Sequence, residues 1–334
     1  MTVFVEAPAR LHFGMLDLRG SLGRRYGGVG AGLPTPSVSV SATLSKTLTV
    51  NGEPGAIDAA TQAARRFLAR YGPECGAELT IHRTLPAHRG LGSGTQLALA
   101  TARALAELYQ LPVPVVDLAQ VVGRAQRSAI GTYVFGLGGC VLEGGRRTDT
   151  SDPRPAPLVS RLPIPPAWRC VLALPAASPG VSGAEEARAF ASLPPPPERD
   201  AERVAHLVLM GLWPALADAE FEAFGAHLSE LQRINGRWFA AAQGGTYAPG
   251  PSTELIAALT AWGATGVGQS SWGPAVYALA PDEAAGKTLA NQVREWLAAR
   301  VGGAGGGAGG RDGGTVYEGP FSHSGATIGR SGSG

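Results

Sequence analysis

The chain has 334 residues, of which 44% are hydrophobic, so it can bury the core of one large or two ordinary domains. Its 28 Lys and Arg residues nearly balance its 26 Asp and Glu residues, and no stretch carries the dense basic clustering of a nucleic-acid-binding surface. No apolar run is long enough to cross a membrane, and the first residues lack the pattern of a signal peptide. We therefore expect a cytoplasmic globular protein with neither a nucleic-acid nor a membrane partner.

Hydrophobic periodicity predicts both strands and helices along the chain. Strands are expected at Val3–Glu6, Ser37–Val50, Ala77–Arg83, Gly138–Glu143 and Trp168–Leu174, with a final one around Thr315–Ile328. Helices are expected at Ile57–Tyr71, Thr95–Gln110, Pro114–Arg124, Asp200–Ala217, Glu220–Asn235, Thr253–Trp262 and Asp282–Arg300. The pattern predicts two α+β halves, over residues 1–155 and 156–334, joined by a proline-rich linker at Asp152–Pro166. The glycine-rich stretch Gly302–Gly314 is typical of a flexible connector.

The segment "PAHRGLGSGTQLALATARAL", Pro86–Leu105, sets a glycine- and serine-rich loop directly before an apolar helix. It lacks the lysine of a P-loop, the third glycine of a dinucleotide fingerprint and the flanking glycines of a nucleophile elbow. Backbone N–H groups in such a bend, followed by the positive end of a helix, form a cradle for an anion. We predict that the loop binds phosphate or pyrophosphate; the alternative is a helix end capped by Ser93 or Thr95.

Three motifs occur in the order found in the GHMP kinase superfamily. "EAPARLHFG" resembles the first motif of that superfamily, "PAHRGLGSGTQLALA" the second, and "GVGQSSWGPAVYAL" the third. The resemblance implies a two-lobed α+β fold. Its N-terminal lobe, residues 1–155, would resemble domain 2 of ribosomal protein S5, and its C-terminal lobe, residues 156–334, would be a ferredoxin-like α/β unit.

Two departures separate the chain from the kinases of that superfamily. Gly94 stands where those kinases usually carry a second serine that helps to hold magnesium, and the stretch before Glu143 lacks the carboxylate that many of them use in catalysis. "PARLHFGMLDL", "RGLGSGTQLALA" and "RSAIGTYVFGLGG" instead resemble the β-ribofuranosylaminobenzene 5'-phosphate synthases, a branch of the superfamily. An ATP-dependent small-molecule kinase and a non-catalytic phosphometabolite-binding protein are the alternatives.

The resemblance implies a decarboxylating phosphoribosyl transferase of methanopterin biosynthesis. Such an enzyme condenses 5-phosphoribosyl 1-pyrophosphate with 4-aminobenzoate or 4-hydroxybenzoate and releases CO₂ and pyrophosphate. Mg²⁺ as cofactor and a homodimeric state are further implications. Departure of pyrophosphate leaves an oxocarbenium-like sugar, so charge stabilisation and positioning should dominate catalysis.

The predicted site combines the glycine loop with charged and hydroxyl side chains of all three motifs. The catalytic residues are Arg10, His12, Arg127 and Ser128, and Asp17 is the candidate Mg²⁺ ligand. The substrate- and phosphate-binding residues are Arg24, Arg25, Arg89, Gly90, Leu91, Gly92, Ser93, Gly94, Thr95, Gln96, Ser270 and Ser271.

Each of these assignments has a structural alternative. Arg10 and His12 lie two apart in a predicted strand and should share one face, which suits an aromatic acid that loses CO₂ but also suits a solvated surface. For Asp17, a turn-capping role is the more frequent explanation. Arg124 is interpreted as a residue that decorates a helix end, and Trp272 as a core residue outside the catalytic set.

Overall fold

The computed structural model describes residues 1–72, 76–149, 154–178, 180, 183–301 and 313–332. The strands are β1 (Thr2–Asp17), β2 (Arg24–Ser45), β3 (Thr49–Asn51), β4 (Gly76–Arg83), β5 (Cys140–Glu143), β6 (Arg146–Arg147), β7 (Leu158–Leu162), β8 (Arg169–Pro175), β9 (Thr265–Gln269), β10 (Val276–Ala280), β11 (Gly314–Pro320) and β12 (Thr327–Ser331). The helices are α1 (Pro54–Tyr71), α2 (Ser93–Leu108), α3 (Val115–Val121), α4 (Ile130–Leu137), α5 (Gly183–Ser192), α6 (Glu198–Leu207), the π-helical turn η1 (Val208–Leu212), α7 (Trp213–Ala217), α8 (Phe221–Gln243), α9 (Pro251–Ala261) and α10 (Glu283–Val301).

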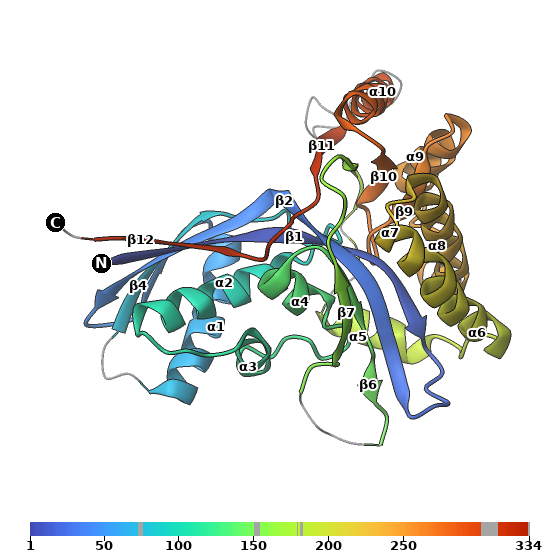
Figure 1. Cartoon of the computed structure of the whole chain (residues 1–334). Helices are drawn as coiled ribbons and strands as arrows, with labels where there is room; N and C mark the ends of the chain where they lie inside the picture. The colour runs from blue at the N-terminus through green and yellow to red at the C-terminus, as the bar shows by residue number, and fades with distance from the viewer. Residues whose placement is uncertain (73–75, 150–153, 179, 181–182, 302–312, 333–334) are drawn as a thin grey trace.

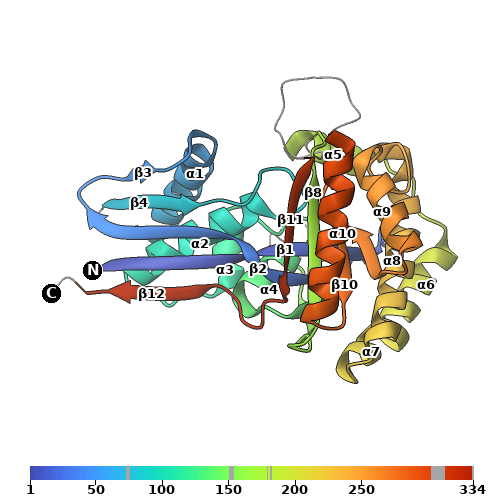
Figure 2. The ribbon, with the colours of Figure 1, turned by 90° about the horizontal axis from the view of Figure 1, so that it is seen from above.

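The first lobe is built on a mostly antiparallel sheet with the strand order β12-β1-β2-β4-β3. Strands β5 and β6 pair with β2, and β7 pairs with β5. Helices α1 to α4 lie on one side of this sheet (Figure 1). The strands at the two ends of the chain, β1 and β12, lie side by side (Figures 1 and 2).

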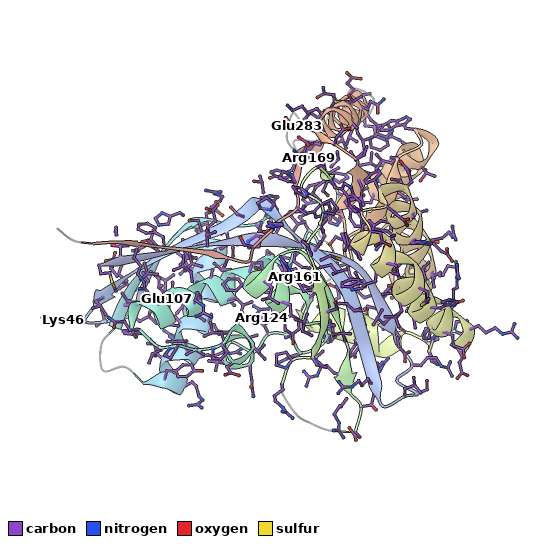
Figure 3. The ribbon with its side chains drawn as sticks, viewed as in Figure 1. Lys46, Glu107, Arg124, Arg161, Arg169 and Glu283 are labelled. Carbon is purple, nitrogen blue, oxygen red and sulfur yellow. The ribbon has the colours of Figure 1, made fainter. Side chains whose placement is uncertain are left out.

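The second lobe is a smaller antiparallel sheet with the order β11-β8-β10-β9. Alternate residues of β8 serve two cores: Val171 and Ala173 pack with α9 and α10, whereas Leu172 joins the main core that continues into the first lobe. Arg169 of β8 forms an ion pair with Glu283 of α10 at 3.5 Å, which Figure 3 labels. The sheet is therefore covered on both faces.

Strand β1 is long enough to belong to both lobes. Its register with β2 runs from Thr2 opposite Thr43 to Asp17 opposite Tyr26. At its far end, α8 of the second lobe hydrogen-bonds its backbone through side-chain amides (Figure 2 shows the two elements meeting). Asn235 accepts from the N–H of Met15 and donates to its carbonyl at 3.1 Å, and Gln232 donates to the carbonyl of Phe13. These buried hydrogen bonds hold the second lobe against the first at a defined position along β1.

Helix α1 shows how local sequence sets the bounds of an element. Pro54 lies in its first turn, where a missing N–H leaves no hydrogen bond unmade, and Gly72 ends it with φ of 56°. Between them Ala56, Ala60 and Phe67 are buried on one face.

The predicted two-lobed α+β fold is confirmed, and several element predictions need correction. Residues 158–162 of the predicted linker form β7, because their backbone pairs antiparallel with β5. The tail forms two strands in different sheets, β11 and β12, where one strand was expected. Helix α4 was missed, because two glycines interrupt its periodicity. Residues 302–312 of the predicted connector lie outside the described residues. The boundary at residue 155 stays a prediction, and β7 and β12, which follow it, pair with the first sheet.

The close packing of α8 on β9 gives a test of the fold. A Cβ added at Gly225 would lie 2.3 Å from Oγ1 of Thr265, so Gly225→Val should overpack this contact and lower the free energy of unfolding by about 1–3 kcal/mol. Gly55→Ala, in the first turn of α1, meets open space and should raise the free energy of unfolding by about 0.5–1 kcal/mol. Urea unfolding of the unmodified protein and of both variants measures these changes in the free energy of unfolding. Equal changes in the two variants would contradict the close packing at Gly225.

Candidate active site

The loop that joins β4 to α2 is held against a turn of the second lobe. Gly90 has φ of +83°, and a Cβ there would lie 2.2 Å from the carbonyl oxygen of Ser270, so the contact admits only glycine. Gly92, with φ of +74°, ends the loop, and its carbonyl accepts hydrogen bonds from the N–H groups of Thr95 and Gln96 at 3.0 and 2.9 Å. Helix α2 therefore begins at Ser93 with its positive end toward the loop.

A cavity of about 580 Å³, here called the loop cavity, opens beside this helix end. It is lined by the glycines of the loop, by the first turns of α1 and α2, and by the charged side chains of Arg10, Arg124 and Glu186. The volume suits a phosphorylated sugar. The predicted anion cradle thus borders a space that can hold the rest of such a molecule.

Arg10 projects from β1 into the loop cavity. Its backbone N–H donates to the carbonyl of Leu91 at 3.0 Å, and its Nη1 donates to the carbonyl of Gly90 at 3.4 Å. Its Nε is buried and has no hydrogen-bond partner among the described residues. Burial lowers the pKa of Arg10 to about 10, an effect that the carboxylate of Glu186 opposes, so the guanidinium stays charged at neutral pH. Arg10 is a half-buried cation at the mouth of an anion cradle.

His12, two residues along β1, lines a second cavity of about 50 Å³. Its imidazole is buried, and Nε2 has no hydrogen-bond partner in the described part of the chain. Burial first, and then the charge of Arg10, lower the pKa of His12 to about 3. The ring is therefore neutral at physiological pH and presents a nitrogen that can still donate or accept a hydrogen bond.

Aromatic side chains form much of the wall of this second cavity, here called the aromatic cavity. Phe190, Phe239 and Trp272 contact one another edge to face, with ring centroids 5.0–5.7 Å apart. Polar Gln232, Asn235 and Gln269 line other parts of it. Such a wall suits a flat ring that carries a polar substituent at each end.

Two neighbouring serines connect the cavities. Ser270 is fully buried; its Oγ accepts the backbone N–H of His12 at 3.0 Å and donates to the carbonyl of Gly90 at 2.6 Å. Ser271, held at φ of +54°, lines both the loop cavity and the aromatic cavity. The two cavities are therefore adjacent, with Ser271 at the junction.

Helix α5 borders both cavities. Its Glu186 lines the loop cavity and its Phe190 lines the aromatic cavity. Arg127 holds this helix in place, because it forms an ion pair with Glu186 and lies over the ring of Phe190 at 5.1 Å. Arg127 itself contributes to neither lining; it acts on the cavities through the helix.

Comparisons with known proteins agree with this arrangement. Residues 58–139 match the GHMP kinases N terminal domain, and residues 214–299 match the GHMP kinases C terminal family. A β-ribofuranosylphenol 5'-phosphate synthase of Archaeoglobus fulgidus is 35% identical over 305 residues, which cover 89% of this chain and 93% of the relative. The chain belongs to the β-ribofuranosylphenol 5'-phosphate synthase family. A synthase of the same name from Methanothermobacter thermautotrophicus is also 35% identical, over 84% of this chain and 89% of its own length.

Solved structures confirm the fold of this synthase-family chain. The phosphomevalonate kinase of Streptococcus pneumoniae superposes with a TM-score of 0.65 at 15% identity, covering 96% of this chain and 99% of that one. Among the described residues, no helix is both long and apolar enough to span a membrane.

Several residues predicted for the site of this synthase-family member lie outside the linings of both cavities. Gln96 is buried and donates to the carbonyl of Gly131 at 2.9 Å, which ties α2 to α4. Arg89 donates to the carbonyls of Pro175 and Ala177 and so bridges to the second lobe. The others outside the linings are Asp17, Arg24, Arg25, Leu91, Arg127, Ser128 and Ser270. Arg10, His12, Gly90, Gly92, Ser93, Gly94, Thr95 and Ser271 line a cavity. The catalytic and binding roles of both groups of residues stay predictions.

Ser128 belongs to a buried network at the start of α4. Its Oγ accepts the N–H of Ile130 at 3.3 Å, and the carboxylate of Glu143 accepts the N–H groups of Ala129 and Gly145 at 3.4 and 2.8 Å. Burial, opposed by these hydrogen bonds, raises the pKa of Glu143 to about 7. Ser128 thus helps to fix the turn that carries Arg127.

The cavities also contain residues that the sequence analysis did not select. Arg124 and Glu186 line the loop cavity, and Gln232 and Asn235 line the aromatic cavity. Of these four residues, only Arg124 stands out in the sequence, as a second basic residue near Arg127, and the sequence analysis interprets it as a helix-end residue. The other three lie on helices of the second lobe and reach the site only through folding.

The carboxylates available near the loop cavity determine how a magnesium ion could be bound there. The described residues contain no group of three or more His, Cys, Asp or Glu side chains that could hold a metal ion. Asp17 accepts the backbone N–H groups of Arg19 and Gly20, in the turn-capping arrangement that was its alternative. Glu53 and Glu186 line the loop cavity. This set fits an ion that is held mainly by substrate phosphates and one or two carboxylates.

Because folded His12 is neutral, we expect the free energy of unfolding to depend on pH. Below pH 6.5 the unfolded chain protonates His12 while the folded chain does not, so acidification favours the unfolded state. Between pH 7 and pH 5 this group should remove about 2 kcal/mol from the free energy of unfolding. His12→Asn should lose that part of the pH slope in urea unfolding. Identical slopes for the two proteins would contradict a buried neutral imidazole.

Proposed function

We propose that this protein joins the anomeric carbon of 5-phosphoribosyl 1-pyrophosphate to the ring of a 4-substituted benzoate, and so releases pyrophosphate and CO₂. One observation carries the proposal: an anion cradle and an aromatic cavity are adjacent at Ser271, in a chain whose relatives are named for a ribofuranosyl-arene phosphate product. The donor and the acceptor of such a reaction need those two environments side by side.

The loop cavity is the proposed site of the phosphoribosyl donor. The N-terminal end of α2 and the glycine loop offer backbone N–H groups, and Ser93 and Thr95 add hydroxyl groups. Arg10 supplies a half-buried positive charge beside them. These groups stabilise a leaving pyrophosphate, whose negative charge grows as the bond to the sugar breaks.

The aromatic cavity is the proposed site of the acceptor acid. Its 50 Å³ is smaller than the cavity of about 150 Å³ that holds benzene in an engineered protein, so a side chain must move when the ring enters. Phe190 is suited to that movement, since it lies on the ten-residue helix α5, whereas Phe239 and Trp272 belong to a long helix and to the turn after β9. The unpartnered Nε2 of His12 is the group that meets a polar substituent of the acid.

The reaction proceeds in two steps. The ring carbon that bears the carboxylate attacks the anomeric carbon, one carbon–carbon bond forms, and the carbon–oxygen bond to pyrophosphate breaks. The carbon–carboxylate bond then breaks, its electron pair restores the aromatic ring, and CO₂ leaves. The 4-hydroxyl or 4-amino group supplies electron density to the ring during the first step. The names of the relatives specify a phenol product, which favours the hydroxy acid as acceptor.

The remaining parts of the proposal follow from the family resemblance. Mg²⁺ would supply charge neutralisation at the pyrophosphate when bound, with Glu53 and Glu186 as the nearest acidic residues in the cavity. We propose a cytoplasmic homodimer that acts in methanopterin biosynthesis.

The direct test is release of labelled CO₂ from carboxyl-labelled 4-hydroxybenzoate and, separately, 4-aminobenzoate. With 5-phosphoribosyl 1-pyrophosphate and Mg²⁺, and without ATP, we expect donor-dependent release that is stoichiometric with pyrophosphate. The rates with the two acids rank the acceptors. Absence of release from folded protein, or transfer of phosphate from ATP to a small alcohol, would replace this proposal by the kinase alternative.

A further inference from the structure

Arg124 lies flat against the first turn of α2. A Cβ added at Gly94 would lie 3.3 Å from its Nη2, 3.4 Å from its Nη1 and 3.6 Å from its Cζ. A Cβ at position 94 would require the guanidinium to shift by a few tenths of an ångström, and a longer side chain such as serine would displace it further. Figure 3 shows Arg124 in the first lobe, on the side of the sheet that the helices cover.

The surroundings of Arg124 are electrostatically unfavourable for a cation. It lies beside the positive end of α2, a helix with no acidic residue in its first turn. Burial and the neighbouring guanidinium of Arg66 both lower the pKa of Arg124. Its Nε is buried without a hydrogen-bond partner among the described residues, and no described carboxylate forms an ion pair with it. A charge in such a position requires a negative partner that the described chain does not supply.

Arg10 lies against the same loop at Gly92. A Cβ at Gly92 would lie 3.4 Å from Nε of Arg10, and both Arg10 and Arg124 line the loop cavity. The two guanidinium groups thus flank Gly92 and Gly94, which are separated by one residue. An anion bound at this end of the cavity would lie near both guanidinium groups and the N-terminal end of α2.

We propose that Arg124 binds the pyrophosphate group of the donor together with Arg10, and that Gly94 is required because it gives the Arg124 guanidinium room against the helix. This inference rests on the proposed function and assigns the pyrophosphate, instead of the 5'-phosphate, to the cradle. Two guanidinium groups and a helix end match the charge of a diphosphate better than that of a single phosphate. Their attraction also increases as the diphosphate departs, which is the requirement for accelerating the reaction.

The test measures binding of inorganic pyrophosphate by titration calorimetry in Mg²⁺-containing buffer. Arg124→Met, which keeps the bulk of the side chain and removes its charge, should weaken binding on the order of 10- to 100-fold. Gly94→Ser should weaken binding on the order of tenfold; Gly94 has no positive φ, so a serine is tolerated by the backbone. Arg65→Met, an exposed position on α1 outside the cavity, makes the same change in net charge and should leave the affinity within about twofold.

A double variant separates contact with the ligand from general damage. If Gly94 acts through Arg124, then Gly94→Ser should have little further effect in the Arg124→Met background. Additive losses, or an unchanged affinity in Arg124→Met, would overturn the inference. Ribose 5-phosphate carries the 5'-phosphate of the donor and no pyrophosphate, so Arg124→Met should bind it with unchanged affinity. If Arg124→Met instead lost affinity for ribose 5-phosphate and still bound pyrophosphate, the inference would also be overturned.

Failure of this inference can be distinguished from failure of the proposed function. Pyrophosphate binding is measured without the acceptor acid and without turnover. Arg124-dependent binding in a protein that releases no CO₂ would keep the pyrophosphate contact and reject the synthase reaction. If the protein released CO₂ and Arg124→Met left kcat/KM for the donor unchanged, the synthase reaction would stand and the contact between Arg124 and pyrophosphate would be rejected.

Discussion

The hydroxyl of Ser270 holds together three segments that are far apart in the sequence. It accepts the N–H of His12 in β1 and donates to the carbonyl of Gly90 in the loop before α2, while its own backbone belongs to the second lobe. Because His12 and Ser270 are buried, loss of the hydroxyl would leave the N–H of His12 unpaired, and the carbonyl of the half-buried Gly90 would keep the 3.4 Å hydrogen bond from Arg10. The position of both cavities depends on this atom: the loop cavity lies on the Gly90 side and the aromatic cavity on the His12 side.

Helix α5 adds a second constraint, because it serves both cavities at once. Glu186 and Phe190 are one turn apart, so the charge beside Arg10 and part of the wall of the aromatic cavity belong to one short element. Arg127 holds that element through an ion pair and a cation–π contact. A shift of α5 that enlarges the aromatic cavity would therefore also move the carboxylate of Glu186 in the loop cavity.

The sequence predicted what depends on local pattern and missed what depends on tertiary contacts. The glycine loop, Arg10 and His12 were found because motif and spacing reveal them. Gln96 was assigned to phosphate since it follows the loop, yet the turn of α2 directs it into the core toward Gly131. Arg124 was interpreted as a helix-end residue, because nothing in the local sequence shows that its guanidinium reaches Gly94, thirty residues earlier. Strand β7 was missed because its partner β5 is distant and its flanks are rich in proline.

The central claim is that donor and acceptor occupy two adjacent cavities that meet at Ser271. A crystal structure with 5-phosphoribosyl 1-pyrophosphate, Mg²⁺ and benzoate tests it most directly, because benzoate lacks the 4-substituent that the reaction needs. We expect pyrophosphate at the N-terminal end of α2 near Arg10 and Arg124, and the ring among Phe190, Phe239 and Trp272. Pyrophosphate bound away from the loop, or benzoate outside the aromatic cavity, would contradict it.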